Sequence, residues 1–228
     1  MFPTIRSITR KVSGFFGGES SVPETRAATQ DMIDNVACPF WKRIVASGDL
    51  NPYINESDEL VVPVFTLVNK AKQFGLGRVE ALAVASLVST GQLVGVGINN
   101  FGKVNLNKLH LAKGVAHDDG FAFKPGSGMY DKEQLSETIS YLNRNSSNGK
   151  ISYATLAKRK QEIADSLGIE VSGASLVENK LLFAYLGGIE NDGVMVSDID
   201  KFFKGEDPAT ITTTEISKSV LANDYNFS

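Results

Sequence analysis

Residues 175–186 read SLVENKLLFAYL, and their apolar side chains follow the three- and four-residue spacing of an α-helix. The same spacing recurs along most of the chain, in residues 29–36, 39–46, 60–74, 78–93, 104–111, 132–142, 153–167 and 197–203. No stretch has the sustained two-residue alternation that is typical of a half-buried β-strand. We therefore expect an all-α fold, a single compact domain of about eight to ten helices.

The first 28 residues differ from the rest and predict an N-terminal arm ahead of a domain at residues 29–228. No acidic residue precedes Glu19, and the early basic residues are Arg6, Arg10 and Lys11. Several apolar residues of this segment fall on one helical face. Two interpretations stay open, a flexible terminus or an amphipathic segment such as an organelle transit peptide.

Composition excludes several classes of protein. The chain has 228 residues, of which 42% are apolar, and 23 Lys and Arg against 26 Asp and Glu give a net charge of −3. This balance argues against nucleic acid as the main partner. Residues 81–98 are the most membrane-like segment, but their glycines and polar side chains predict a buried helix and no transmembrane segment. Without a secretory signal we expect an intracellular protein, cytoplasmic unless the arm is a transit peptide. The oligomeric state is open.

Cys38 is the only cysteine, which excludes an internal disulfide and a zinc site built from several thiolates. It directly precedes Pro39, a residue type favoured in the first turn of a helix. A thiolate at a helix N-terminus is stabilised by unpaired backbone N–H groups. Cys38 is therefore a candidate metal-binding thiolate or nucleophile, and the alternative is a buried free cysteine.

Glu178 lies in the middle of the apolar stripe of residues 175–186. At 100° per residue, Leu181 and Leu182 straddle it and Tyr185 follows one turn later. A carboxylate on a buried face needs a partner or has a shifted pKa, which suits a general acid–base group. The alternative is a boundary glutamate that reaches water.

His117 stands among acidic residues in a glycine-rich loop, in the sequence AHDDG at 116–120. Loops of this kind often carry functional side chains. We treat His117 as a candidate site residue, with a solvated loop histidine as the alternative.

Two stretches have the glycine of an EF-hand calcium loop, residues 144–155 and 188–199. Their first and twelfth positions carry no carboxylate, and calcium binding requires several. We therefore expect no calcium site.

Four segments in order resemble the haem-thiolate peroxidase family, which includes fungal chloroperoxidase and the unspecific peroxygenases. The first is ACPFWKRIVASGDLNP at 37–52, similar to the Pro-Cys-Pro helix start of the family. The second is 102–120, which holds Leu106 to Leu109 and then AHD, where the family has Glu-His-Asp. The third is Val177-Glu178, and the fourth is FFKGEDP at 202–208. The chain resembles a divergent member of the short, histidine-bearing branch.

This resemblance implies a b-type haem with Cys38 as the axial ligand of its iron and a peroxidase or peroxygenase activity. Pro39, Phe40 and Phe121 are the further residues implied to contact the cofactor. Glu178 is implied as the acid–base group opposite the thiolate, held by His117, with hydrogen peroxide and a small apolar organic molecule as substrates. Further aromatic residues that the resemblance suggests for the pocket are Phe101, Phe123, Phe183 and Tyr185.

The chain departs from the family at its magnesium site. The glutamate and serine that hold the ion in the family are Ala116 and Gly120 here. We expect a weakened site, with His117, Asp118 and Asp119 as the remaining candidates. Two other functions stay open: a haem-binding protein of the same fold without catalysis, and a haem-free helical interaction module.

Overall fold

The computed structural model describes residues 27–36, 38–73, 88, 102–112, 117–124 and 127–211. Helices make up most of this part of the chain, but short strands lie among them. The helices are α1 (Gln30–Asp34), α2 (Pro39–Ala46), α3 (Val64–Gln73), the 3-10 helix η2 (Leu106–Leu111), α5 (Lys132–Arg144), α6 (Tyr153–Leu167), α7 (Gly173–Tyr185) and α8 (Val196–Lys204). The strands are β1 (Tyr53–Ile54), β2 (Leu60–Pro63), β3 (Lys103–Asn105), β4 (Lys150–Ile151) and β5 (Val194–Met195). The expectation of an all-α fold is therefore wrong, and the fold is mixed.

The sequence did not predict the strands, because they are short and because β2 is apolar on both faces. Leu60, Val61 and Val62 are all buried, so the strand shows no alternation, and it runs directly into α3. Its antiparallel neighbours are β1 on one side and β3 on the other, with Val61 opposite both Tyr53 and Asn105. A strand of two or three residues carries too little pattern to be recognised in a sequence.

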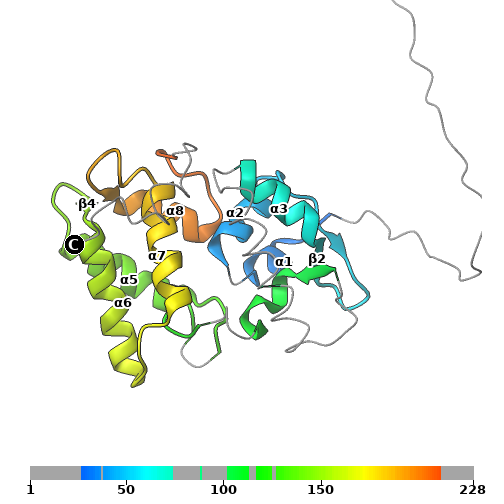
Figure 1. Cartoon of the computed structure of the whole chain (residues 1–228), viewed down its shortest axis with the longest axis horizontal. Coiled ribbons are helices and arrows are strands. Elements are labelled where there is room, and N and C mark those ends of the chain that lie inside the picture. Colours follow the sequence, from blue (N-terminus) through cyan, green and yellow to red (C-terminus); the bar gives the residue numbers. More distant parts are fainter. Residues whose placement is uncertain are drawn as a thin grey trace, which may run out of the picture.

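The buried side chains form two clusters. The N-terminal core gathers residues of α1, α2, α3 and the three-stranded sheet, with Ile44 and Leu60 fully buried. The C-terminal core gathers residues of α5 to α8, with Leu142 and Ile199 fully buried. Figure 1 shows these two groups of elements side by side, with α2 and α8 at their junction. Phe40 on α2 packs against both cores, so this helix joins the two halves.

The C-terminal half is built from two helix–loop–helix units. Helices α5 and α6 form the first and α7 and α8 the second, and their loops pair through β4 and β5. Gly193 has φ +137°, and a Cβ on it would lie 2.8 Å from the Ile151 carbonyl oxygen. Glycine is therefore required where the loops meet. The pairing holds α7 in place beside α6.

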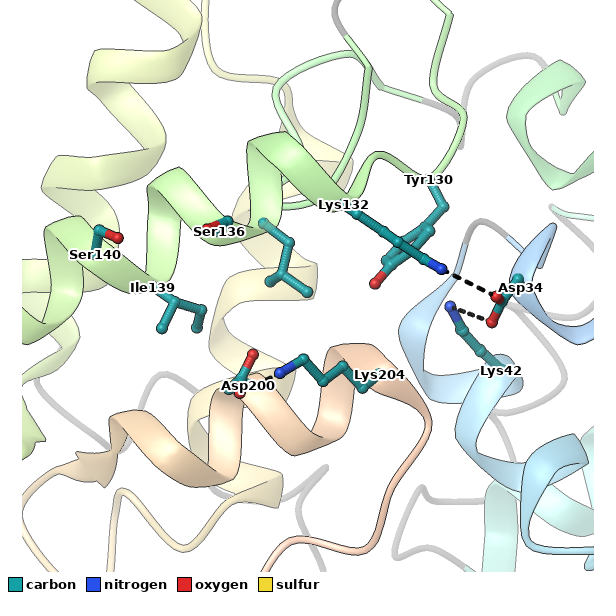
Figure 2. Close-up of a pocket in the computed structure, with 10 residues that line it drawn as sticks. Asp34, Lys42, Tyr130, Lys132, Ser136, Ile139, Ser140, Asp200 and Lys204 are labelled. Atoms are coloured by element: carbon teal, nitrogen blue, oxygen red, sulfur yellow. Dashed lines mark hydrogen bonds and ion pairs between the residues drawn. The ribbon is translucent and has the colours of Figure 1, made fainter. Parts of the chain in front are cut away.

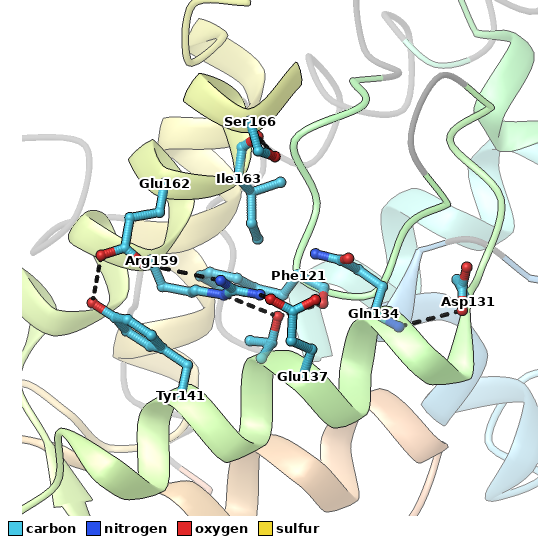
Figure 3. Close-up of polar contacts among 10 residues, drawn as sticks. Phe121, Asp131, Gln134, Glu137, Tyr141, Arg159, Glu162, Ile163 and Ser166 are labelled. Carbon is cyan, nitrogen blue, oxygen red and sulfur yellow. Dashed lines mark hydrogen bonds and ion pairs between the residues drawn. The ribbon is translucent and has the colours of Figure 1, made fainter. Parts of the chain in front are cut away.

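Polar contacts also tie α5 to α6 and to the loop that carries His117. Arg159 on α6 forms an ion pair with Glu137 on α5 at 3.0 Å (Figure 3). The Thr138 hydroxyl donates a hydrogen bond of 3.0 Å to the Phe121 carbonyl oxygen. These contacts fix the loop against the first helix–loop–helix unit.

Within the residues that the structure describes, no helix is long and apolar enough to cross a membrane. Apart from Val88, the segment 81–98 lies outside those residues, and so does the arm up to residue 26.

Candidate functional site

Cys38 is the N-cap residue of α2, with an extended backbone conformation (φ −74°, ψ 117°), and Pro39 follows in the first turn. The thiol is partly buried and packs against the N-terminal core. The backbone N–H groups of Phe40 and Trp41 lie near enough to the sulfur to lower the pKa of the thiol, although the side chain forms no regular cap hydrogen bond. The predicted helix start is therefore present, with the sulfur at the N-terminus of α2.

The protonation state of Cys38 is set by opposing effects. Burial and the negative charge of Glu178 raise the pKa of the thiol to about 12, and the two backbone N–H groups only partly offset them. Cys38 therefore carries a neutral thiol at pH 7. The charge of Glu178 thus acts on the Cys38 thiol, although the two residues are far apart in sequence.

Glu178 on α7 meets His117 across a short contact. The distance between His117 Nε2 and Glu178 Oε2 is 2.6 Å, and on the other side of the ring His117 Nδ1 lies 2.9 Å from Asp119 Oδ1. The His117 side chain is only 8% exposed, and that of Glu178 is 26% exposed. Both ring nitrogens therefore face carboxylates, which favours the doubly protonated, charged imidazolium.

His117, Glu178 and Asp119 each stabilise the charged form of a neighbour. Burial acts to lower the pKa of His117, but Glu178 and Asp119 outweigh it and raise the pKa to about 9. Burial acts to raise the pKa of Glu178, but Lys160 and His117 outweigh it and lower the pKa to about 2. Asp119 behaves in the same way, because contacts with His117 and Ser175 bring its pKa to about 2 against the effect of burial. The site is a network of charged groups at neutral pH.

Gly120 shapes the loop that carries His117. A Cβ at this position would lie 2.1 Å from the Phe123 ring, which packs directly over the glycine. The Phe123 ring centroid lies 5.4 Å from that of His117. Gly120 therefore lets Phe123 cover one face of the imidazole, and a serine would not fit here without a shift.

Lys160 on α6 is the site residue that sequence analysis missed. Its side chain is 1% exposed, with Nζ 3.7 Å from Glu178 Oε2 and 4.7 Å from the centroid of the Phe121 ring. The signal was present in the sequence, because Lys160 shares a helical face with the buried Leu156 and Ile163. A charge on an apolar stripe was the same observation that singled out Glu178.

The aromatic residues suggested for a cofactor pocket have different surroundings. Phe40 meets Tyr185 edge to face at 5.8 Å, at the junction of the two cores. Phe121 packs against Phe203 as well as Lys160. Phe183 and Tyr185 are 1% and 3% exposed and belong to the C-terminal core. Phe101 and Ala116 lie outside the described residues.

The side chains present do not fit a magnesium site. Among the described residues, no group of three His, Cys, Asp or Glu is arranged to hold a metal ion. His117 and Asp119 are engaged with each other, and His117 also meets Glu178. The Phe123 ring fills the space that a side-chain ligand at position 120 would need.

Cys38 is chemically suited to bind haem iron. A thiol at a helix N-terminus with two backbone donors is a suitable axial ligand, and coordination to iron would remove its proton despite the raised pKa. On the acid–base side, the buried His117 Nδ1 and Glu178 Oε2 are already engaged in charged contacts, with Asp119 at 2.9 Å and with His117 at 2.6 Å.

A second charged cluster lies elsewhere, at a cavity of about 470 Å³ bordered by α5 and α8 (Figure 2). The buried Lys42 lies 3.4 Å from Asp34, which also contacts the exposed Lys132 at 3.5 Å. Burial lowers the pKa of Lys42, and Asp34 partly opposes this. This cluster does not include the residues that sequence analysis selected.

In comparisons with known proteins, no family model and no curated protein matches this chain.

Proposed function

We propose that the protein is a haem-thiolate peroxidase or peroxygenase that uses hydrogen peroxide to oxidise or oxygenate a small apolar organic molecule. The observation that carries this proposal is the contact of 2.6 Å between His117 and Glu178, in electrostatic range of the sole cysteine at the start of α2. His117 and Glu178, selected from separate sequence segments, are in direct contact, and the charge of Glu178 acts on Cys38 from a third segment.

Cys38 would hold the haem iron, with Pro39 and Phe40 beside it at the start of α2. The N–H groups of Phe40 and Trp41 would stabilise the thiolate by donating to the sulfur. A haem bound in this way supplies the iron at which the O–O bond of a peroxide is cleaved, and the thiolate favours that cleavage.

Glu178 would act as the acid–base group. It is ionised at neutral pH and can take the proton from one oxygen of the peroxide and deliver it to the leaving oxygen. His117, charged and held by Asp119 at 2.9 Å, would fix the direction of the carboxylate. Replacement of Glu178 should then slow turnover about 100-fold or more, the usual contribution of general acid–base catalysis.

The same charge network also supports the second candidate, a haem-binding protein without turnover. A carboxyl group with a pKa of about 2 is a weak base, and a strong base is what proton abstraction requires. Cofactor binding without catalysis needs only Cys38.

Peroxide-dependent oxidation of an apolar probe by the haem-loaded protein separates these candidates. We expect turnover in the unmodified protein, its loss in Glu178→Gln with haem still bound, and normal turnover in Glu190→Gln, which changes an exposed glutamate. Haem binding without any turnover would support the second candidate. Absence of haem binding would contradict both candidates and would favour a haem-free helical interaction module.

A further inference from the structure

The buried ammonium group of Lys160 has no function in the roles assigned so far. Its Nζ lies 3.7 Å from Glu178 Oε2, and no acceptor in the described part of the chain lies within hydrogen-bonding geometry of it. A buried lysine without an acceptor is costly, and an apolar residue of similar size would serve packing better. The charge itself is therefore the property to be explained.

The surroundings of Lys160 are balanced in charge. Glu178 and Asp119 supply two negative charges, and His117 and Lys160 supply two positive charges at neutral pH. Without Lys160, a single imidazolium would face the buried Asp119 carboxylate and the partly buried Glu178 carboxylate. The uncompensated charge would favour protonation of one of them.

His117 and Lys160 interact with Glu178 in different ways. His117 contacts Glu178 directly at 2.6 Å, whereas Lys160 stands back at 3.7 Å and lies over the Phe121 ring at 4.7 Å. The ring stabilises the ammonium through a cation–π contact and keeps it away from the carboxylate. Lys160 therefore acts on Glu178 mainly through charge, and it approaches Oε2, the same oxygen that His117 contacts.

We propose that Lys160 is a positioning residue of the acid–base pair, whose ammonium keeps the Glu178 carboxylate ionised and turned toward His117. The catalytic part of this inference rests on the proposed function, but the effect on ionisation does not depend on haem. The groups that face Glu178 are His117, Lys160, Asp119 and, more distantly, Cys38.

The test follows the titration of the Glu178 carboxyl group by NMR, together with the pH profile of peroxide-dependent turnover. The variants are Lys160→Met, which removes the charge, Lys160→Arg, which keeps it, and Lys158→Met, which changes an exposed lysine on the same helix. In Lys160→Met we expect the Glu178 midpoint to rise by about one pH unit or more, and the acid limb of turnover to rise with it. In Lys160→Arg the Glu178 midpoint should stay close to that of the unmodified protein. In Lys158→Met it should not change.

An unchanged Glu178 midpoint in Lys160→Met would overturn the proposal. Should that variant not fold, the unmodified protein still decides, because a Glu178 midpoint at or above the ordinary glutamate value contradicts a dominant effect of Lys160. The two proposals fail separately. A shifted midpoint in a protein that binds no haem supports the role of Lys160 and contradicts the proposed function, whereas haem-dependent turnover with an unshifted midpoint does the reverse.

Discussion

Lys42 and Lys160 are both 1% exposed, and each lies over an aromatic ring close to a carboxylate. Their surroundings differ. Lys42 shares Asp34 with the exposed Lys132 beside an open cavity, so two cations surround one carboxylate that is 29% exposed. The Lys42 ammonium is 3.5 Å from the centroid of the Tyr130 ring.

The cluster at Lys160 has two carboxylates, an imidazole and an ammonium in a largely buried setting. The side chains of Asp34 and Glu178 are similarly exposed, at 29% and 26%, but Glu178 Oε2, which faces both cations, is itself buried, so neighbouring side chains compensate the charge on that oxygen. A buried lysine beside an acid is therefore no sign of a site by itself. The two clusters differ in the number of ionisable groups whose protonation states depend on one another.

The largest contrast between the clusters should be in turnover. His117→Gln removes the cation that directs Glu178, so we expect kcat for peroxide-dependent oxidation to fall by about 100-fold. Asp34→Asn changes the corresponding carboxylate partner at Lys42 and should leave kcat within about twofold. Steady-state kinetics at saturating peroxide measures both, and equal losses in the two variants would contradict the distinction.

The stability of the Lys160 cluster should depend on pH in both directions. Glu178 has a pKa lowered from 4.5 to about 2. Its contribution to the free energy of unfolding is therefore present above pH 4.5 and is lost as the pH falls through 2. His117 has a pKa raised from 6.5 to about 9, so its contribution is present below pH 6.5 and is lost as the pH rises through 9.

The free energy of unfolding should therefore be greatest between about pH 4.5 and 6.5, with an alkaline loss on the order of 2–3 kcal/mol from His117. Urea unfolding from pH 3 to 10 measures it. In His117→Gln the loss between pH 6.5 and 9 should largely disappear. A loss of the same size in that variant would show that another group is responsible.

Removal of the charge should cost more stability at Lys160 than at Lys42. Lys160→Met leaves His117 alone against the Asp119 and Glu178 carboxylates, and we expect a loss of about 2 kcal/mol at pH 7. Lys42→Met leaves Asp34 paired with Lys132 and open to water, so the loss should stay below about 1 kcal/mol. Chemical denaturation of the two variants side by side checks the order, and a reversed order would contradict the account.

Gly120→Ala should have the smallest effect of this set. The new Cβ would meet the Phe123 ring at 2.1 Å, so we expect a loss of about 1–2 kcal/mol through displacement of the ring from His117. Thermal unfolding gives the loss. Gly120→Ala combined with Phe123→Ala should lose less than the sum of the single variants, whereas simple additivity would show that the two residues do not touch.

Sequence patterns selected His117 and Glu178, which are in direct contact in the structure, but they missed the short strands of the fold. Cys38, His117 and Glu178 each broke a local pattern, respectively as the sole thiol before a proline, a histidine among acids and an acid on an apolar stripe. The short strands broke no pattern, because β2 is apolar on both faces and continues directly into α3.

Lys160 was missed for a different reason. Lysine on an amphipathic helix usually extends its ammonium to water. For that reason the position of Lys160 on the apolar face of α6 did not mark it as a candidate site residue. The apolar stripe of α6 marks Lys160 as buried, but only the approach of α7 and of the loop at residues 117–124 shows which groups its charge acts on.

The central claim is the proposal that the Cys38 sulfur would hold haem iron and that Glu178 would act as the acid–base group. The absorption spectrum of the haem-loaded, dithionite-reduced protein under carbon monoxide tests it most directly. The account predicts the long-wavelength Soret band of thiolate-bound haem, absent in Cys38→Ala and retained in Glu178→Gln. A spectrum that is the same with and without the Cys38 sulfur would contradict it.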